Sequence, residues 1–200
     1  MTKIKLCGMQ RAVDIAAANR ARPEYVGFVF ARESRRAVTA AQAAVLRAQL
    51  APEICAVGVF VDAPPEMVAR LLHAGTIDVA QLHGHEDAAY LKALRKLTAK
   101  PLIQAFRIAA VADVARANAS SAEMVLVDAG AGSGICLDWR LLDKMQRPYF
   151  LAGGLTPENV AQTIARCAPY AVDVSSGIET AGVKDDEKIQ DFVKRVRRDE

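Results

Sequence analysis

Eight short apolar segments recur along the chain at nearly even spacing, and this repeat restricts the possible folds more than any other feature. Each is rich in the β-branched, aliphatic and aromatic residues that buried strands prefer. The segments are KIKLCG, YVGFVF, ICAVGVFV, DVAQLHG, PLIQAFRI, EMVLVDAG, PYFLAGG and AVDVSSG. The first begins at Lys3 and the last at Ala171. The average step is therefore about 24 residues, the size of one strand followed by one helix.

Stretches with helical periodicity separate these segments, among them TAAQAAVLRAQL, EDAAYLKALRKL and PENVAQTIARC. Near-continuous apolar strands that alternate with helices indicate a parallel sheet covered on its faces. An open, doubly wound sheet would usually carry a glycine-rich dinucleotide fingerprint after the first strand, where this chain has CGMQRAVD. Eight units without a longer central crossover favour closure of the sheet into a barrel instead. We predict an α/β fold in which residues 1–200 form a single-domain (β/α)8 TIM barrel.

Composition and charge indicate which kinds of binding partner and which compartment to expect. An apolar content of 52% and a charged content of 24% are ordinary for a globular protein, and no apolar run is long enough to span a membrane. With no leader-like N-terminus, we expect a cytoplasmic protein without a membrane partner. The net charge is +3, but the basic residues form no stripe with aromatic residues, so we expect no nucleic-acid partner. The cysteines are scattered without a CxxC pair, which indicates reduced thiols: Cys7, Cys55, Cys136 and Cys167.

In a barrel of this kind, functional residues lie where the strands end. After the seventh and eighth segments come AGGLTPENV and DVSSGIE, which combine glycines with small hydroxyl residues. Glycine lets backbone N–H groups approach an anion closely, and barrels commonly bind phosphate at this place. The alternative is that these glycines only form tight turns. We favour a phosphate site made of Gly153, Gly154, Ser175, Ser176 and Gly177.

The sixth segment leads into VDAGAGSGICLDW, from Val127 to Trp139. Its glycines follow the spacing GxGxG, so the nucleotide fingerprint is incomplete, and we interpret residues 129–137 as a lid. Asp128 precedes this loop at the end of an apolar strand, a position typical of a general acid. The alternative role for Asp128 is to stabilise the loop.

Cys7 ends the first segment. A buried cysteine is usually an inert, small apolar residue, whereas a thiol at a strand end facing a pocket can act as a base or nucleophile. The residues alone leave both alternatives open. His83 and His85 have no third ligand at metal-binding spacing, so we expect no metal site.

The set of strand ends resembles phosphoribosylanthranilate isomerases, which are barrels of the ribulose-phosphate-binding type. The matching motifs occur in the family's order between Lys5 and Asp185: KLCGM, GFVFARESRRAV, QLHGHE, AFRI, VDAGAGSGICLDW, FLAGGLTPENV and VDVSSGIETAGVKD. The resemblance implies an Amadori rearrangement of N-(5-phosphoribosyl)anthranilate to 1-(2-carboxyphenylamino)-1-deoxyribulose 5-phosphate in tryptophan biosynthesis. It assigns the general base to Cys7 and the general acid to Asp128, with no metal or organic cofactor.

The resemblance also implies substrate-binding residues. Arg36 would hold the anthranilate carboxylate, because a guanidinium suits that geometry. Gly154, Ser176 and Gly177 would hold the phosphate. The departures from the family are Arg35, Leu137 and Ala131, where the family usually has Pro, Phe and Gly. Three further polar residues at or near strand ends either line the pocket or are structural, and we assign substrate binding to the first of them: Gln81, Arg107 and Asp173.

Two other classes of function are possible alternatives: a sister barrel enzyme and a catalytically silent barrel. Among sister enzymes, an indole-glycerol-phosphate synthase would carry catalytic Lys and Glu residues at several strand ends, and a ribulose-phosphate epimerase would carry metal-binding His and Asp residues. Neither set is present in the sequence. A silent phosphate-binding barrel would have no chemical need for both Cys7 and Asp128. We therefore expect an enzyme with a small-molecule substrate, and we leave open whether it is a monomer or a homodimer.

Overall fold

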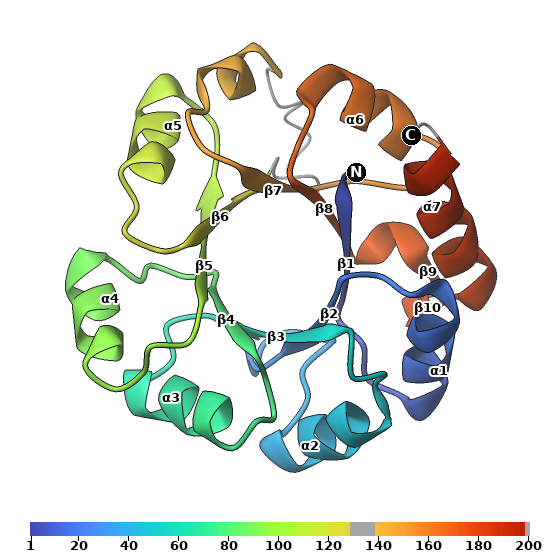
Figure 1. Cartoon of the computed structure of the whole chain (residues 1–200), viewed down its shortest axis with the longest axis horizontal. Helices are drawn as coiled ribbons and strands as arrows, with labels where there is room; N and C mark the ends of the chain where they lie inside the picture. The colour runs from blue at the N-terminus through green and yellow to red at the C-terminus, as the bar shows by residue number, and fades with distance from the viewer. Residues whose placement is uncertain (129–138, 199–200) are drawn as a thin grey trace.

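The computed structural model describes residues 1–128 and 139–198, and its centre is a closed barrel of parallel strands. The strands follow one another around the barrel in chain order, and the last pairs with the first (Figure 1). Their bounds are β1 Lys3–Cys7, β2 Tyr25–Val29, β3 Cys55–Phe60, β4 Val79–Leu82, β5 Leu102–Arg107, β6 Met124–Asp128, β7 Tyr149–Ala152 and β8 Ala171–Val174. The predicted barrel is confirmed, and each strand coincides with one of the predicted segments.

Helices form a ring outside the barrel (Figure 1). Their bounds are α1 Ala12–Ala21, α2 Ala40–Gln49, α3 Pro65–His73, α4 Ala88–Arg95, α5 Val111–Asn118, α6 Val160–Cys167 and α7 Asp186–Arg198. The sixth unit differs from the predicted pattern, because the described part of its connection holds a 3-10 helix, η1 Trp139–Lys144. The eighth unit adds a 3-10 turn, η2 Ser176–Ile178, and a small hairpin of β9 Glu179–Thr180 and β10 Val183–Lys184.

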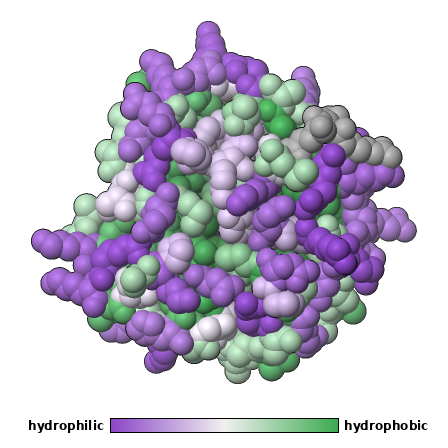
Figure 2. Space-filling view, in the orientation of Figure 1, coloured by the Kyte–Doolittle hydropathy of each residue, from purple (hydrophilic) through white to green (hydrophobic). Residues whose placement is uncertain are grey.

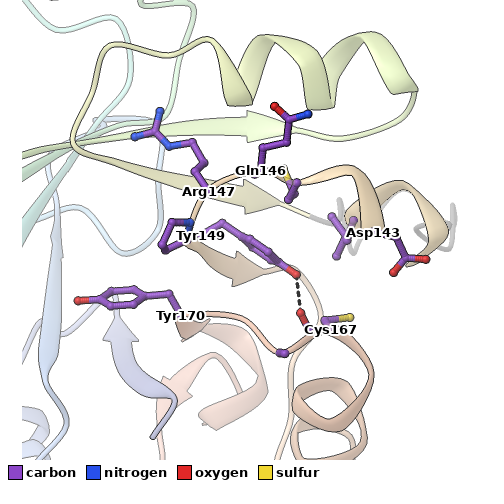
Figure 3. A pocket seen from close by; sticks show the side chains of 10 residues that line it. Asp143, Gln146, Arg147, Tyr149, Cys167 and Tyr170 are labelled. Atoms are coloured by element: carbon purple, nitrogen blue, oxygen red, sulfur yellow. Dashed lines mark hydrogen bonds between the residues drawn. The ribbon is translucent and has the colours of Figure 1, made fainter.

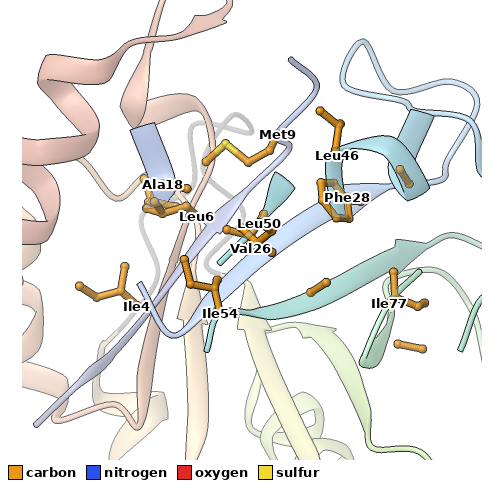
Figure 4. Packing of buried hydrophobic residues seen from close by; sticks show 14 of the residues in the cluster. Ile4, Leu6, Met9, Ala18, Val26, Phe28, Leu46, Leu50, Ile54 and Ile77 are labelled. Atoms are coloured by element: carbon orange, nitrogen blue, oxygen red, sulfur yellow. The ribbon is translucent and has the colours of Figure 1, made fainter. Parts of the chain in front are cut away.

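Alternation along β1 shows how the two sides of the barrel wall differ. Ile4 and Leu6 belong to the main apolar cluster between the strands and the helices, where they pack with Val26 and Phe28 of β2 (Figure 4). Burying such side chains contributes roughly 1.5–3 kcal/mol each. Because successive strand residues point to opposite faces, Lys5 and Cys7 face the barrel interior.

Apolar side chains fill the amino-terminal half of the interior. Tyr25, Phe150 and Tyr170 meet edge to face, with ring centroids 5.2 Å apart for Tyr25 and Phe150 and 5.6 Å apart for Phe150 and Tyr170. Val57, Ile103 and other residues near the strand starts complete this layer. A polar interior is thereby restricted to the opposite end, where the strands finish.

The outer surface is mostly polar. On the face seen in Figure 2, hydrophilic side chains predominate around the periphery and the hydrophobic areas between them are small. Within residues 1–128 and 139–198, no helix has both the length and the apolar character that crossing a bilayer requires.

Candidate active site

A cavity of about 310 Å³ opens at the carboxyl ends of the strands. This volume falls at the small end of the range for ligand pockets. Eight of the predicted site residues line it together: Cys7, Arg36, Gln81, Asp128, Gly153, Gly154, Ser175 and Ser176. Gly177 follows directly in η2 but is not among the lining residues. The fold thus brings predicted site residues from six parts of the chain into one cavity.

Cys7 packs closely against β2, because the neighbouring residue on that strand is a glycine. It pairs with Gly27 of β2, and a Cβ on Gly27 would lie 2.8 Å from the Cys7 Sγ. The thiol is only 8% exposed, and burial raises its pKa above the ordinary value of a cysteine, although the nearby ammonium of Lys5 acts in the opposite direction. Any side chain at position 27 would push the thiol out of this position.

Asp128 ends β6 at the rim of the same cavity, where its side chain is 30% exposed. The Nε2 of His83 lies 3.4 Å from Asp128 Oδ2. His83 Nδ1 in turn is 2.8 Å from Nε2 of Gln81. The imidazole of His83 therefore lies between Gln81 and Asp128 at the rim of the cavity, a position that the sequence did not indicate.

Gln81 has one polar atom without a protein partner. Its side chain is 1% exposed, and its Oε1 accepts no hydrogen bond from any described residue. A buried acceptor left in this state costs about 1–3 kcal/mol. Because Gln81 lines the cavity, a donor on a bound molecule is the natural partner for this oxygen.

A carboxylate fixes Arg36 from one side. Glu179 of β9 accepts from Arg36 Nε at 2.6 Å and from Nη2 at 2.8 Å. Gly8 makes room for the arginine stem, since its φ is +83° and a Cβ there would lie 2.5 Å from Arg36 Cδ. Arg36, the residue expected to bind a carboxylate, lines the cavity, whereas the side chain of the adjacent Arg35 is 63% exposed.

Glu179 is itself a buried charge surrounded by cations. Lys184 of β10 donates to its Oε1 at 2.7 Å, in addition to the bonds from Arg36. Burial alone would raise the pKa of Glu179, but the hydrogen bonds and charges of Arg36 and Lys184 outweigh it and lower the pKa to about 2. Sequence analysis did not identify Glu179, because nothing in a two-residue strand after SSG marks its partner.

This shift predicts an acid-sensitive contribution to stability. A carboxyl whose pKa falls on folding from 4.5 to about 2 stabilises the folded protein above pH 4.5, by roughly 3 kcal/mol. That stabilisation is lost as the pH falls from 4.5 towards 2. We therefore expect the difference in unfolding free energy between the wild type and Glu179→Gln to shrink over this range, as measured by urea denaturation.

The variant Asp191→Asn is the matched control, because Asp191 pairs with Arg195 on the surface of α7, where both side chains are more than two-fifths exposed. Its difference from the wild type should stay small at every pH. A Glu179→Gln difference that is independent of pH would contradict the assigned pKa.

The loops after β7 and β8 adjoin each other closely. A Cβ on Gly177 would lie 1.9 Å from the carbonyl oxygen of Leu155, so only glycine fits between the two loops. Gly153 and Gly154 adopt positive φ values of 101° and 65°. The amide N–H groups of Gly154 and Ser176 donate to no acceptor in the part of the chain that is described. Free amides at a cavity wall are suited to an anion.

The remaining predictions separate into three groups. Asp173 lines the cavity, whereas Arg107 is exposed at the end of β5 and lines a different, outer hollow between α4 and α5. The predicted lid, with Ala131, Cys136 and Leu137, lies outside the described residues. Within the described ranges, no three His, Cys, Asp or Glu side chains converge in a way that could hold a metal ion.

A second hollow of about 550 Å³ lies near the starts of β7 and β8, at the opposite end of the barrel (Figure 3). In Figure 3, the Tyr149 hydroxyl points to the carbonyl oxygen of Cys167, to which it donates a hydrogen bond of 2.8 Å. That bond ties β7 to the end of α6. None of the predicted site residues lines this hollow.

Comparisons with known proteins agree in family and fold. The family model described as N-(5'phosphoribosyl)anthranilate (PRA) isomerase matches residues 4–195. An N-(5'-phosphoribosyl)anthranilate isomerase from Endomicrobium trichonymphae is 41% identical, with 98% of this chain and 99% of the relative covered. The structure of a phosphoribosyl anthranilate isomerase in complex with reduced 1-(o-carboxyphenylamino)-1-deoxyribulose 5-phosphate is similar, with a TM-score of 0.86, 31% identity and coverage of 98% and 99%. A structure of monomers of the dimeric phosphoribosylanthranilate isomerase from Thermotoga maritima also has a TM-score of 0.86, with 31% identity and coverage of 99% and 100%.

Proposed function

Because the chain belongs to the phosphoribosylanthranilate isomerase family of tryptophan biosynthesis, we propose that Cys7 and Asp128 are the general base and the general acid of its isomerisation. One observation carries this proposal. A thiol and a carboxyl from separate strands line one cavity with an arginine and with free backbone amides. The substrate has one sugar ring, one aromatic carboxylate and one phosphate, and the cavity offers a group for each.

Proton transfers by Asp128 and Cys7 account for the reaction. Asp128 donates a proton to the furanose ring oxygen, the bond from that oxygen to C1′ breaks, and the nitrogen lone pair forms a protonated Schiff base. The Cys7 thiolate then removes the proton from C2′, which gives an enolamine and a neutral thiol. In the tautomerisation to the ketone, the Asp128 carboxylate takes the proton of the C2′ hydroxyl and the Cys7 thiol returns a proton to C1′, so both groups regain their starting states. These steps use only acid–base chemistry, so we propose that no metal or organic cofactor takes part.

Arg36 is proposed to bind the anthranilate carboxylate. Glu179 occupies the Nε and Nη2 edge of the guanidinium, which leaves the Nη1 donors for a second carboxylate. A guanidinium fixed on one edge loses little freedom when the other edge binds, and this pre-organisation favours affinity.

The phosphate is proposed to lie between the loops after β7 and β8. Gly153, Gly154, Ser175 and Ser176 line the cavity there, and Gly177 keeps the two loops in contact. Lys184 donates to the carbonyl oxygen of Ser175 at 2.8 Å, which fixes this loop to the hairpin that carries Glu179. The carboxylate and phosphate sites are thus joined through one hydrogen-bonded hairpin.

Gln81 is proposed to accept a hydrogen bond from a ribose hydroxyl through its unpartnered Oε1. Replacing Gln81 with methionine keeps the length of the side chain and removes this acceptor, together with the Nε2 group that lies 2.8 Å from His83 Nδ1. We expect kcat/KM to fall about 5- to 15-fold, the effect of about one net hydrogen bond to the substrate. Steady-state kinetics with freshly prepared phosphoribosylanthranilate measure this change.

Gln104→Met is the matched control for that variant, because Gln104 lies on β5 outside the cavity and bonds to Glu86 and Ser120. It should leave kcat/KM near the wild-type value. If both variants lose the same factor, or Gln81→Met loses none, the proposed contact with the ribose is wrong.

We propose a cytoplasmic location, because a thiol base must stay reduced and the cytoplasm favours reduced thiols. Cys7, Cys55 and Cys167 are free thiols in the structure. We propose a small molecule as the substrate of this chain, and a monomer or a homodimer as its assembly.

A further inference from the structure

A fully buried lysine lies inside the barrel beneath Cys7. Lys5 has 0% exposure, a rare state for a lysine, which is almost never buried without a partner. Its partner is Asp173 of β8, which is 7% exposed. The Lys5 Nζ donates to the two carboxylate oxygens of Asp173 at 3.0 and 2.9 Å.

The strand register places this pair directly below the thiol. Lys5 is paired with Asp173 across the β1–β8 ladder, and Cys7 is the next residue of β1 that faces the interior. The ammonium has three N–H groups, two of which are used by Asp173. Cys7 and Asp173 both line the cavity above this pair, and the charge of the Lys5 ammonium lowers the pKa of the Cys7 thiol.

Stability alone gives little reason for such a pair. Removing two charges from water costs several kcal/mol per ion, and well-packed apolar residues of similar volume often stabilise a fold as well or better. The neighbouring interior positions, such as Tyr25 and Val57, are apolar. A functional reason for the buried pair is that its cation lies directly under a thiol that must lose its proton.

We propose that Lys5, held in place by Asp173, is a positioning residue that stabilises the thiolate of Cys7 as the base for the C2′ proton. This inference rests on the proposed role of Cys7. Lys5 keeps its own proton throughout, and the proton taken from C2′ resides on the Cys7 sulfur. The ion pair therefore supplies a fixed field and takes no part in proton transfer.

The charges that face Cys7 come from four elements. Lys5 of β1 and Lys184 of β10 favour the thiolate, and Asp173 of β8 opposes it. Arg36, in the loop after β2, is a further cation whose own pKa is raised in part by Cys7. Gly27 and Val59, which contact the thiol from β2 and β3, carry no charge.

The test compares Lys5→Met, Asp173→Asn and the double variant with the wild type. The quantity measured is the ultraviolet thiolate absorbance of Cys7 between about pH 6 and pH 11, taken as the difference from a matched Cys7→Ser protein in each background. Lys5→Met should lower the thiolate fraction near neutral pH at least about 10-fold, because the closest cation is gone. Asp173→Asn should raise that fraction, because the opposing carboxylate is gone and the thiolate becomes the anionic partner of Lys5.

Opposite changes in the thiolate fraction of Lys5→Met and Asp173→Asn distinguish an electrostatic role from a purely structural one. General loosening of the barrel would change the thiolate fraction of both variants in the same direction. The double variant carries no unpaired buried charge and should still titrate above the wild type, which keeps the test valid if Lys5→Met alone does not fold. Shifts of the same sign, or an unchanged titration in Lys5→Met or the double variant, would overturn the inference.

The titration does not depend on turnover, so the two proposals fail separately. If the shifts are as expected and Cys7→Ser keeps wild-type activity, Lys5 stabilises the thiolate but Cys7 is not the base. If Cys7→Ser is inactive and the shifts are absent, Cys7 remains the base and the role of Lys5 is wrong.

Discussion

Cys7→Ser is expected to lower kcat about 1,000-fold while KM changes by less than about threefold, within the usual contribution of a general base. Serine keeps the shape of the side chain at the end of β1 and its contact with Gly27. Its hydroxyl remains protonated throughout the accessible pH range, so the C2′ proton has no acceptor. The loss of anthranilate fluorescence during turnover provides the rate.

Cys55→Ser is the matched control for this variant. Cys55 begins β3 at the other end of the barrel, and burial raises the pKa of its thiol to about 12. The control should retain wild-type kcat. An active Cys7→Ser protein would leave the fold and substrate in place but would remove Cys7 as the base.

Asp128→Asn is expected to lower kcat by about 100- to 10,000-fold, because an amide of the same shape cannot donate a proton to the ring oxygen. The contact with His83 can persist, since an amide oxygen also accepts a hydrogen bond. Binding of the reduced product analogue, measured by calorimetry, should change by less than about threefold. That combination of lost turnover and retained binding identifies a group that acts on the transition state.

Asp143→Asn provides the comparison for Asp128→Asn, because Asp143 lies on η1 and pairs with Arg166 on the surface. It should keep wild-type kcat. If Asp128→Asn weakens binding of the analogue as much as it lowers kcat, Asp128 serves binding and the acid must be sought elsewhere.

The fold was largely predictable because its signal is local and repeated. Each strand buries a short apolar run, and the helices between them keep a period near 3.6, so the eight units are visible one by one. Closure then follows from their number and even spacing. The connection after β6 differs from the predicted pattern, because its described part forms the 3-10 helix of Trp139–Lys144. Apolar periodicity does not distinguish a 3-10 helix from an α-helix.

The site was predictable to the extent that it follows from the strand ends. Cys7, Asp128 and the loops after β7 and β8 meet there because parallel strands all end at one mouth of the barrel. Arg107 also ends a strand, but its side chain is exposed and lines an outer hollow. A strand end alone does not fix the direction of the last side chain.

Charged partners that are distant in sequence were not predictable. Lys5 and Asp173 are 168 positions apart, and Arg36 and Glu179 are 143 apart. Pairing of this kind depends on the register of β1 with β8 and on a short hairpin, neither of which leaves a pattern in the chain. A lysine in the apolar run KIKLC and an aspartate in AVDV are local signals of interior charges, but they do not show that the two residues pair.

In the proposed reaction, Cys7 accepts the proton that leaves C2′ of the ribose. The most direct test of this step is a single-turnover measurement with phosphoribosylanthranilate that carries deuterium at C2′, compared with the unlabelled substrate, in the wild type and in Cys7→Ser. We expect the wild type to convert the unlabelled substrate rapidly and the deuterated one several-fold more slowly, and we expect the residual rate of Cys7→Ser to be far lower with either substrate. A wild type without turnover, or a Cys7→Ser protein that shows the wild-type rate and isotope effect, would contradict the proposed reaction.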